Sequence, residues 1–169
     1  MIVYHGSNVV VEQPKILQSV RMLDFGVGFY TTSNKGQAVR WAEKVADRRE
    51  PSEKIVSLYE FDCEEAERNL TIIRFDEPTE KWLDFVCANR SGRKIADPYD
   101  IVIGPVADDM VYTVVQFYEN GVYDKNDAIK RLKVEALFNQ ILFHTDRALA
   151  YCCFTGFMKI GGEQIDGSK

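Results

Sequence analysis

Short apolar runs typical of β-strands alternate along this chain with segments of helical spacing, and no regular strand–helix–strand period links them. A doubly wound parallel sheet needs such a period, so that architecture is disfavoured. The pattern indicates an α+β domain in which most strands are antiparallel. With 169 residues the chain is long enough for one domain with a substantial core. We expect a single domain over residues 1–160 and a polar, frayed tail over residues 161–169.

The expected strands are marked by apolar alternation and by β-rich composition. Residues 54–61 (KIVSLYEF) alternate between apolar and polar side chains, which is typical of a half-buried strand. Residues 99–104 (YDIVIG) form a nearly continuous apolar run, which is typical of a buried strand. The other expected strands cover residues 2–4, 28–32, 69–75 and 139–143.

The expected helices follow from apolar residues at helical spacing. Ser33 and Asn34 are good N-caps for a helix over residues 37–48, on which Ala38, Trp41 and Ala42 share one face. For Trp41, a place beside a ligand and a place in the hydrophobic core are equally good interpretations. Further helices are expected over residues 78–89, 107–120, 125–132 and 146–154. The expected caps of the two central helices are Asp108 and Asp109 for the first and Asn126 or Asp127 for the second.

The charge balance argues against general affinity for nucleic acid. The formal net charge is -5, so the protein as a whole repels a phosphate backbone. A few basic residues could still form a local patch, although a solvated helix face is the better explanation for them; they are Arg21, Arg40, Lys44, Arg48 and Arg49.

The cysteines and histidines are too few and too irregularly spaced to predict a metal site. There are four cysteines and two histidines, and no C-x-x-C pair. Cys152 and Cys153 lie in an apolar run and are expected to be buried thiols. Since no disulfide framework, signal peptide or membrane-spanning run is visible, we expect a cytoplasmic protein without a membrane partner.

Three segments combine glycine, aromatic and polar residues in ways that suit a ligand, although each alone also reads as an ordinary loop or strand end. The first is Tyr4-His5-Gly6-Ser7, which offers an imidazole and bare backbone groups at a strand end. The second is residues 24–30 (DFGVGFY), whose aromatic rings could stack on a flat ligand. The third is Asn139-Gln140, whose amides could bind a sugar hydroxyl.

Taken in order, these segments resemble the poly(ADP-ribose) polymerase-like branch of the ADP-ribosyltransferases, whose His, Tyr and Glu motif residues lie on three separate strands. The chain is also similar to an uncharacterised bacterial family of such domains, often found beside a small antitoxin-like protein, through YDIVIGPVADD (99–109) and NQILFHT (139–145). The resemblance implies an ADP-ribosyltransferase-like fold with split, mostly antiparallel sheets. It also implies a cytoplasmic transferase that uses NAD as co-substrate and no metal.

The resemblance assigns a role to each matching position. His5 would bind the 2′-hydroxyl of the adenosine ribose, Gly6 would hold the nicotinamide carboxamide through its backbone, and Tyr30 would stack on the nicotinamide ring. Trp41 would complete the aromatic sandwich. Relatives carry a hydroxyl at the position of Ala38, so that contact would be lost or would come from Ser7 or Thr31. The implied catalytic residues are His5, Tyr30 and Gln140, and the implied NAD-binding residues are His5, Gly6, Ser7, Phe25, Gly28, Tyr30 and Trp41.

One position departs from that pattern, because Gln140 stands where the family has glutamate. Glutamine keeps a hydrogen bond to the ribose but brings neither negative charge nor a base, which typically costs roughly 3–4 kcal/mol of transition-state stabilisation. An acidic acceptor could supply the missing charge itself, or a carboxylate of Glu135, Asp108 or Asp109 could replace it. His144 receives no role from the resemblance and is expected to be structural.

The expected function is therefore mono-ADP-ribosylation of a protein or nucleic-acid acceptor, as the toxin of a toxin–antitoxin pair. The first alternative is a catalytically weak or inactive module that binds NAD or ADP-ribose and acts through protein–protein contacts. A phosphotransferase acting on an RNA 2′-phosphate is disfavoured, because that related branch uses a second histidine and an arginine where this chain has Tyr30 and Gln140.

Overall fold

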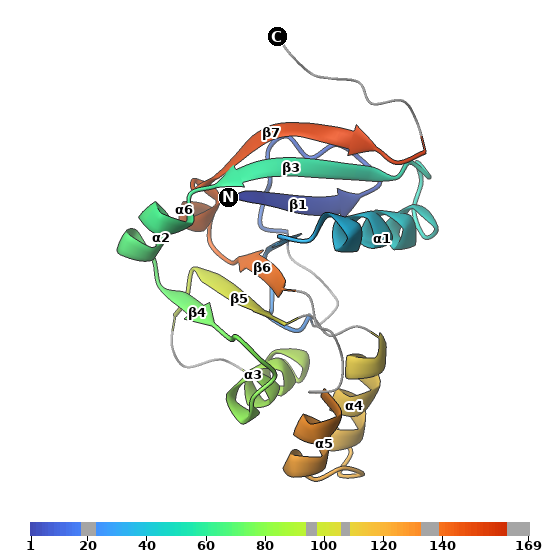
Figure 1. Cartoon of the computed structure of the whole chain (residues 1–169), viewed down its shortest axis with the longest axis vertical. Coiled ribbons are helices and arrows are strands. Elements are labelled where there is room, and N and C mark those ends of the chain that lie inside the picture. The colour runs from blue at the N-terminus through green and yellow to red at the C-terminus, as the bar shows by residue number, and fades with distance from the viewer. Residues whose placement is uncertain (18–22, 94–97, 106–108, 133–138, 162–169) are drawn as a thin grey trace.

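The computed structural model describes residues 1–17, 23–93, 98–105, 109–132 and 139–161, with the backbone alone at 109–112. The described strands form one seven-stranded sheet in the order β4-β5-β6-β2-β1-β3-β7 (Figure 1). Only the β4–β5 pair is parallel among them. The strands are β1 (Ile2–Ser7), β2 (Phe29–Thr32), β3 (Ile55–Phe61), β4 (Ile72–Arg74), β5 (Ile101–Pro105), β6 (Asn139–Phe143) and β7 (Cys152–Lys159).

The helices cover different parts of this sheet. Helix α1 lies beside β1, whereas α3, α4 and α5 gather at the opposite end of the molecule, beyond β4 and β5 (Figure 1). The helices are α1 (Lys35–Ala46), α2 (Cys63–Asn69), α3 (Glu80–Arg90), α4 (Asp109–Glu119), α5 (Lys125–Leu132) and α6 (Asp146–Leu149). Within the described residues, no helix is both long enough and apolar enough to cross a bilayer.

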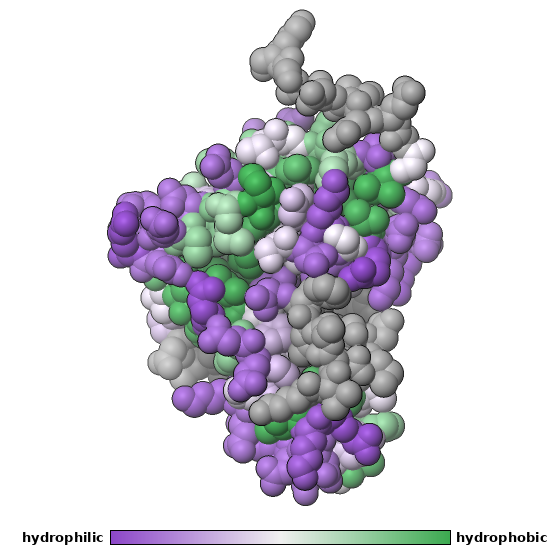
Figure 2. Space-filling model, in the orientation of Figure 1, coloured by the Kyte–Doolittle hydropathy of each residue, from purple (hydrophilic) through white to green (hydrophobic). Residues whose placement is uncertain are grey.

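The core is divided by the sheet, because successive side chains of a strand point to opposite faces. Along β6, Leu142 joins one buried cluster with Phe25 and Trp82, whereas Phe143 joins another with Tyr59. A smaller cluster lies under α1 and is made by Ala38, Ala42 and Val56. Hydrophobic residues also reach the surface around the start of β1 (Figure 2), where Met1 and Ile2 are exposed.

The centre of the sheet contains a weak seam between β1 and β2. These strands pair at a single position, Tyr4 opposite Thr32, whereas β1 and β3 pair from Ile2 to Ser7. The expected split sheets are therefore one continuous sheet whose two halves are joined by little backbone pairing.

The α+β class and the mostly antiparallel pairing are confirmed, and each expected strand overlaps an observed one. The helix expected over residues 146–154 is wrong in its second half, since α6 ends at Leu149 and β7 begins at Cys152. Pairing with β3 along its whole length outweighs the local helical pattern. The alternation of β7 also corrects the cysteines, because Cys152 is buried and Cys153 is exposed.

Two further expectations are corrected by local chemistry. Asp124, not Asn126 or Asp127, caps α5, because its carboxylate accepts the backbone N–H of Asp127 at 2.8 Å. Asn69, the first residue of the strand expected over 69–75, is the last residue of α2. This helix is capped at its start by the side chain of Asp62, which accepts the backbone N–H of Glu65. The expected cap Asp108 and the tail from 162 lie outside the described residues.

Candidate functional site

The three segments singled out in the sequence lie on three neighbouring strands. His5 is on β1, Tyr30 on β2 and Gln140 on β6, and these strands are consecutive in the order β6-β2-β1. Thr32 pairs both with Tyr4 on β1 and with Gln140 on β6, so one row of residues crosses the seam. Segments far apart in the chain are thus brought side by side.

The side chains of these residues are distributed over both faces of the sheet. Tyr30 packs against the cluster that contains Phe25 and Leu142. Gln140 lies on the same face, because it is two residues from Leu142 on β6. The ring of His5 lies on the other face, with its centroid 4.6 Å from that of Phe29. The structure therefore puts Tyr30 and Gln140 on one face of the sheet and the ring of His5 on the other.

His5 is connected to Tyr30 through the backbone. Its Nδ1 lies 2.7 Å from the carbonyl oxygen of Tyr30. A carbonyl oxygen only accepts hydrogen bonds, so Nδ1 carries the proton. Burial lowers the pKa of His5 below its ordinary value of 6.5, although the bond to Tyr30 opposes this shift. The imidazole is therefore neutral at pH 7, and its Nε2 is a hydrogen-bond acceptor.

Gly6 is the point of contact between β1 and α1. A Cβ atom at Gly6 would overlap with the backbone oxygen of Ala38 and lie 2.7 Å from the backbone nitrogen of Ala42. The helix can approach so closely because its inner face carries only alanines at these turns. Its start is fixed by Asn34, whose side chain accepts the N–H of Gln37 at 2.9 Å. The sequence therefore places the α1 backbone directly against the His5-Gly6-Ser7 segment.

Tyr30 is held at both ends. Its ring is partly buried, and its hydroxyl donates to the carbonyl of Gly26 at 2.5 Å. Burial, together with the negative charge of Asp24, raises the pKa of Tyr30 far above its ordinary value, so the hydroxyl stays a donor. Gly26 has a φ of 87°, which a side chain would strain. Gly28 lacks a side chain for another reason, since a Cβ there would overlap with Leu142 of β6.

The remaining expected binding residues differ in their exposure. Phe25 is fully buried, so its side chain belongs to the core and only its loop position could serve a ligand. Trp41 is 53% exposed and is not the core aromatic that its helical face allowed. Ser7 is partly buried. The Thr31 hydroxyl donates to the Ile141 carbonyl at 3.1 Å and is thus already engaged. Within the described residues, the partly exposed Gln140 amide makes no hydrogen bond.

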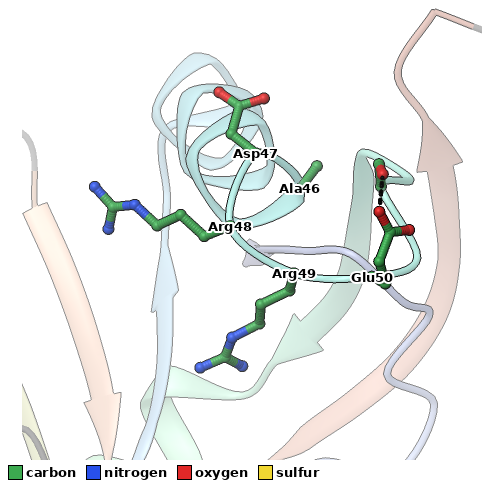
Figure 3. Close-up of a pocket in the computed structure, with 6 residues that line it drawn as sticks. Ala46, Asp47, Arg48, Arg49 and Glu50 are labelled. Carbon is green, nitrogen blue, oxygen red and sulfur yellow. Dashed lines mark hydrogen bonds between the residues drawn. The ribbon is translucent and has the colours of Figure 1, made fainter.

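A polar hollow lies at the end of α1, and sequence reasoning did not find it. Its volume is about 410 Å³, and it is lined by residues 46–50 and Ser52. Arg48 and Arg49 extend to the same side of the turn, whereas Asp47 points away and Glu50 is bonded to Ser52 (Figure 3). The side chain of Asn8 donates to the carbonyl of Pro51 at 3.1 Å and so links this turn to the end of β1.

The other sequence candidates are placed only in part. The side chains of Glu135, Asp108 and Asp109 lie outside the described structure, as does Arg21, so a replacement carboxylate is not placed. His144 stacks on Tyr99, with ring centroids 4.5 Å apart, and contacts the loop before β2. In the described part of the chain, no three His, Cys, Asp or Glu side chains gather closely enough to hold a metal ion.

Comparison with known proteins yields one match. A family model described as a protein of unknown function (DUF3990) matches residues 1–154, which includes all the strands of the candidate site. No curated protein and no solved structure matches the chain.

Proposed function

The chain belongs to the DUF3990 family, whose function is unknown, and from this premise we propose that it transfers ADP-ribose from NAD to an acceptor. The observation that carries the proposal is the seam between β1 and β2. His5 and Gly6 lie on β1, Tyr30 lies on the neighbouring β2, and Gln140 lies on the next strand, β6. An ADP-ribosyltransferase-like fold is part of this proposal, and the antiparallel sheet agrees with it.

The backbone at Gly6 is suited to grip a carboxamide. Beyond Tyr4, β1 has no paired position with β2, whereas on its other side Gly6 pairs with Val56 of β3. Nicotinamide would use one N–H and one C=O from this edge. The close approach of α1 closes the site from one side, because the Ala38 backbone lies against Gly6. Ala38 has no hydroxyl, and Thr31 is engaged elsewhere, so Ser7 is the hydroxyl left to assist.

The remaining contacts to NAD would come from aromatic rings and from both faces of the sheet. The Tyr30 ring would stack on nicotinamide from the sheet side, and the exposed Trp41 on α1 would cover it from the other. His5 lies across the seam from Tyr30. A dinucleotide bound at this seam would have to contact both faces of the sheet. The Nε2 of His5 would then accept a hydrogen bond from a ribose hydroxyl.

The reaction breaks the bond between the ribose anomeric carbon and the nicotinamide nitrogen, and forms a bond from that carbon to a nucleophilic acceptor atom. Positive charge develops on the ribose as nicotinamide leaves. The amide of Gln140 would bind a ribose hydroxyl, but it offers no charge and no base. An acceptor carboxylate needs no deprotonation and brings its own negative charge. The proposal therefore favours transfer of a single ADP-ribose to an acidic side chain.

The proposed biological role follows from the bacterial resemblance. It is that of a toxin acting on a macromolecule and restrained by a small antitoxin protein. The alternative is an NAD-binding or ADP-ribose-binding module without turnover, and the observation that favours it is the glutamine at residue 140.

The decisive experiment separates binding from turnover. NAD binding is measured by calorimetry, and nicotinamide release is measured with NAD and a bacterial lysate, for the wild type, Tyr30→Ala and Gln140→Ala. Transfer requires that the wild type binds NAD and releases nicotinamide, that Tyr30→Ala binds no NAD, and that Gln140→Ala binds without turnover. NAD binding without release of nicotinamide by the wild type would favour the binding module. No binding by the wild type would refute both.

A further inference from the structure

The loop that leads into β2 is held at three successive carbonyl groups. The Tyr99 hydroxyl donates to the carbonyl of Phe25 at 3.2 Å, and the Tyr30 hydroxyl donates to that of Gly26 at 2.5 Å. His144 Nδ1 lies 2.5 Å from the carbonyl oxygen of Val27, so this nitrogen carries the proton and donates it. Loop carbonyls are more often left to water, and three consecutive side-chain bonds fix this loop firmly.

The two outer donors support each other. Tyr99 precedes β5 and His144 follows β6, and their rings stack at an interplanar angle of 29°. Each is anchored in turn through Asp100, whose backbone carbonyl accepts the N–H of His144 at 2.8 Å. The carboxylate of Asp100 accepts the backbone N–H of Thr71 and the hydroxyl of Thr145. The donors are therefore fixed by the sheet and not by the loop that they hold.

We propose that Tyr99 and His144 are positioning residues, which fix the loop over residues 25–28 so that the Tyr30 ring is preset to receive nicotinamide. This inference rests on the proposed function. Tyr30 reaches the loop through its own hydroxyl, so a displaced Gly26 carbonyl would draw the ring with it. A wall that is ordered before binding spares the ligand the entropy of ordering it. His144, which lies away from the His5-Gly6-Ser7 segment in the chain, thereby acquires a role in binding.

The test uses variants that keep ring volume and remove a single donor. They are His144→Phe and Tyr99→Phe. The control, Tyr59→Phe, removes the same kind of bond on the other face of the sheet, where the Tyr59 hydroxyl donates to the carbonyl of Val11 at 2.5 Å. A rescue variant, His144→Asn, restores an N–H donor near the carbonyl of Val27. The dissociation constant for NAD, KM and kcat for nicotinamide release, and the melting temperature are measured for each.

We expect His144→Phe and Tyr99→Phe to raise both the dissociation constant and KM by about tenfold, with kcat within about twofold of wild type. This is the pattern for loss of binding that the ground and transition states share. His144→Asn should recover most of the affinity. Tyr59→Phe should lose as much thermal stability and none of the affinity. A general loss of stability would not produce that split.

The outcomes distinguish this inference from the proposed function. If wild-type protein does not bind NAD, both fall. If wild type binds NAD and His144→Phe and Tyr99→Phe bind it equally well, the positioning role is refuted and the proposed function stands. Should His144→Phe not fold, Tyr99→Phe alone decides, because it removes a single oxygen atom.

Discussion

At the scale of single residues, both histidines act on the same short segment. His5 donates to the carbonyl of Tyr30 and His144 to that of Val27, one from β1 and the other from the end of β6. Since β2 lies between β1 and β6, the segment from Val27 to Tyr30 receives side-chain hydrogen bonds from both neighbouring strands. The two rings therefore take the place of backbone pairing where the strands diverge.

His5 should make stability depend on pH. The pKa of His5 is lowered in the folded protein. Below about pH 6.5 the unfolded chain therefore binds a proton at His5 more readily than the folded protein does. The contribution of His5 to the free energy of unfolding is fully present above about pH 6.5. It is lost as the pH decreases towards the pKa of His5 in the folded protein. The limit for one group is about 1.4 kcal/mol per pH unit. Urea unfolding at pH 7.5 and pH 5.5 should show a smaller loss for His5→Gln than for wild type. Parallel losses would contradict a lowered pKa for His5 in the folded protein.

Gln140→Glu should increase the rate of nicotinamide release. A carboxylate would stabilise the charge that develops on the ribose, which is worth roughly 3–4 kcal/mol, or a hundredfold or more in rate. The change is nearly isosteric, and residue 140 is partly exposed, so the fold should tolerate it. Steady-state release of nicotinamide at saturating NAD measures the effect, with Asn139→Asp as the neighbouring control. An unchanged rate would show that residue 140 does not face the ribose.

The sequence motifs predicted which strands would carry the candidate residues, but not where the side chains point. The glycines before β2 suggested close approach to a ligand, whereas Gly26 serves a left-handed turn and Gly28 serves packing on β6. Phe25 looked like a stacking ring and is buried in the core. The packing of Gly28 and Phe25 depends on residues far away in the chain, such as Leu142 for Gly28 and Phe85 for Phe25, which no local pattern reveals.

At the scale of elements, the contact between α1 and β1 fixes the candidate site. Helix α1 buries Ala38, Ala42 and Ala46 and leaves Trp41 exposed. Capping residues and apolar spacing predicted this helix and the burial of Ala38 and Ala42, but they wrongly allowed Trp41 on the buried face. The same rules failed at the end of the chain, where Tyr151 to Phe154 fits either a helix or a strand. There, the unpaired edge of β3 decided in favour of β7.

Gly6→Ala should destabilise the protein through that contact. The new methyl group would overlap with the backbone of Ala38, and backbone cannot rotate aside as a side chain can. Overpacking of this kind costs about 3 kcal/mol. Urea denaturation measures the loss. Gly36→Ala in α1 is the control, since the nearest atom to a Cβ there is a side-chain atom 3.3 Å away. Equal stability of the two variants would mean that α1 does not press on β1.

At the scale of the whole molecule, the sheet sets the limits of the fold. Strand β7 covers the outer edge of β3 and pairs with it from Cys152 to Lys159. The last backbone bond described beyond it joins the N–H of Ile160 to the carbonyl of Lys54 at 2.8 Å. We therefore expect the fold to depend on the chain up to residue 160.

Truncation should show this limit sharply. A chain ending at residue 160 should melt like the full chain, because it keeps every described strand. A chain ending at residue 151 should lose its cooperative transition, because Tyr59 and Phe61, both fully buried, lose their partner strand. Thermal melts followed by circular dichroism compare the two. A cooperative melt of the shorter chain would show that β7 is dispensable.

The single paired position between β1 and β2 has a mechanical consequence. The sheet consists of two blocks, β4-β5-β6-β2 and β1-β3-β7. The strands within each block pair with one another, and a single paired position joins the two blocks. Amide protons along that junction should exchange with deuterium earlier than those within either block, as the blocks part without unravelling. A dinucleotide bound across the junction would hold the two blocks together, so its binding should slow amide exchange along the junction.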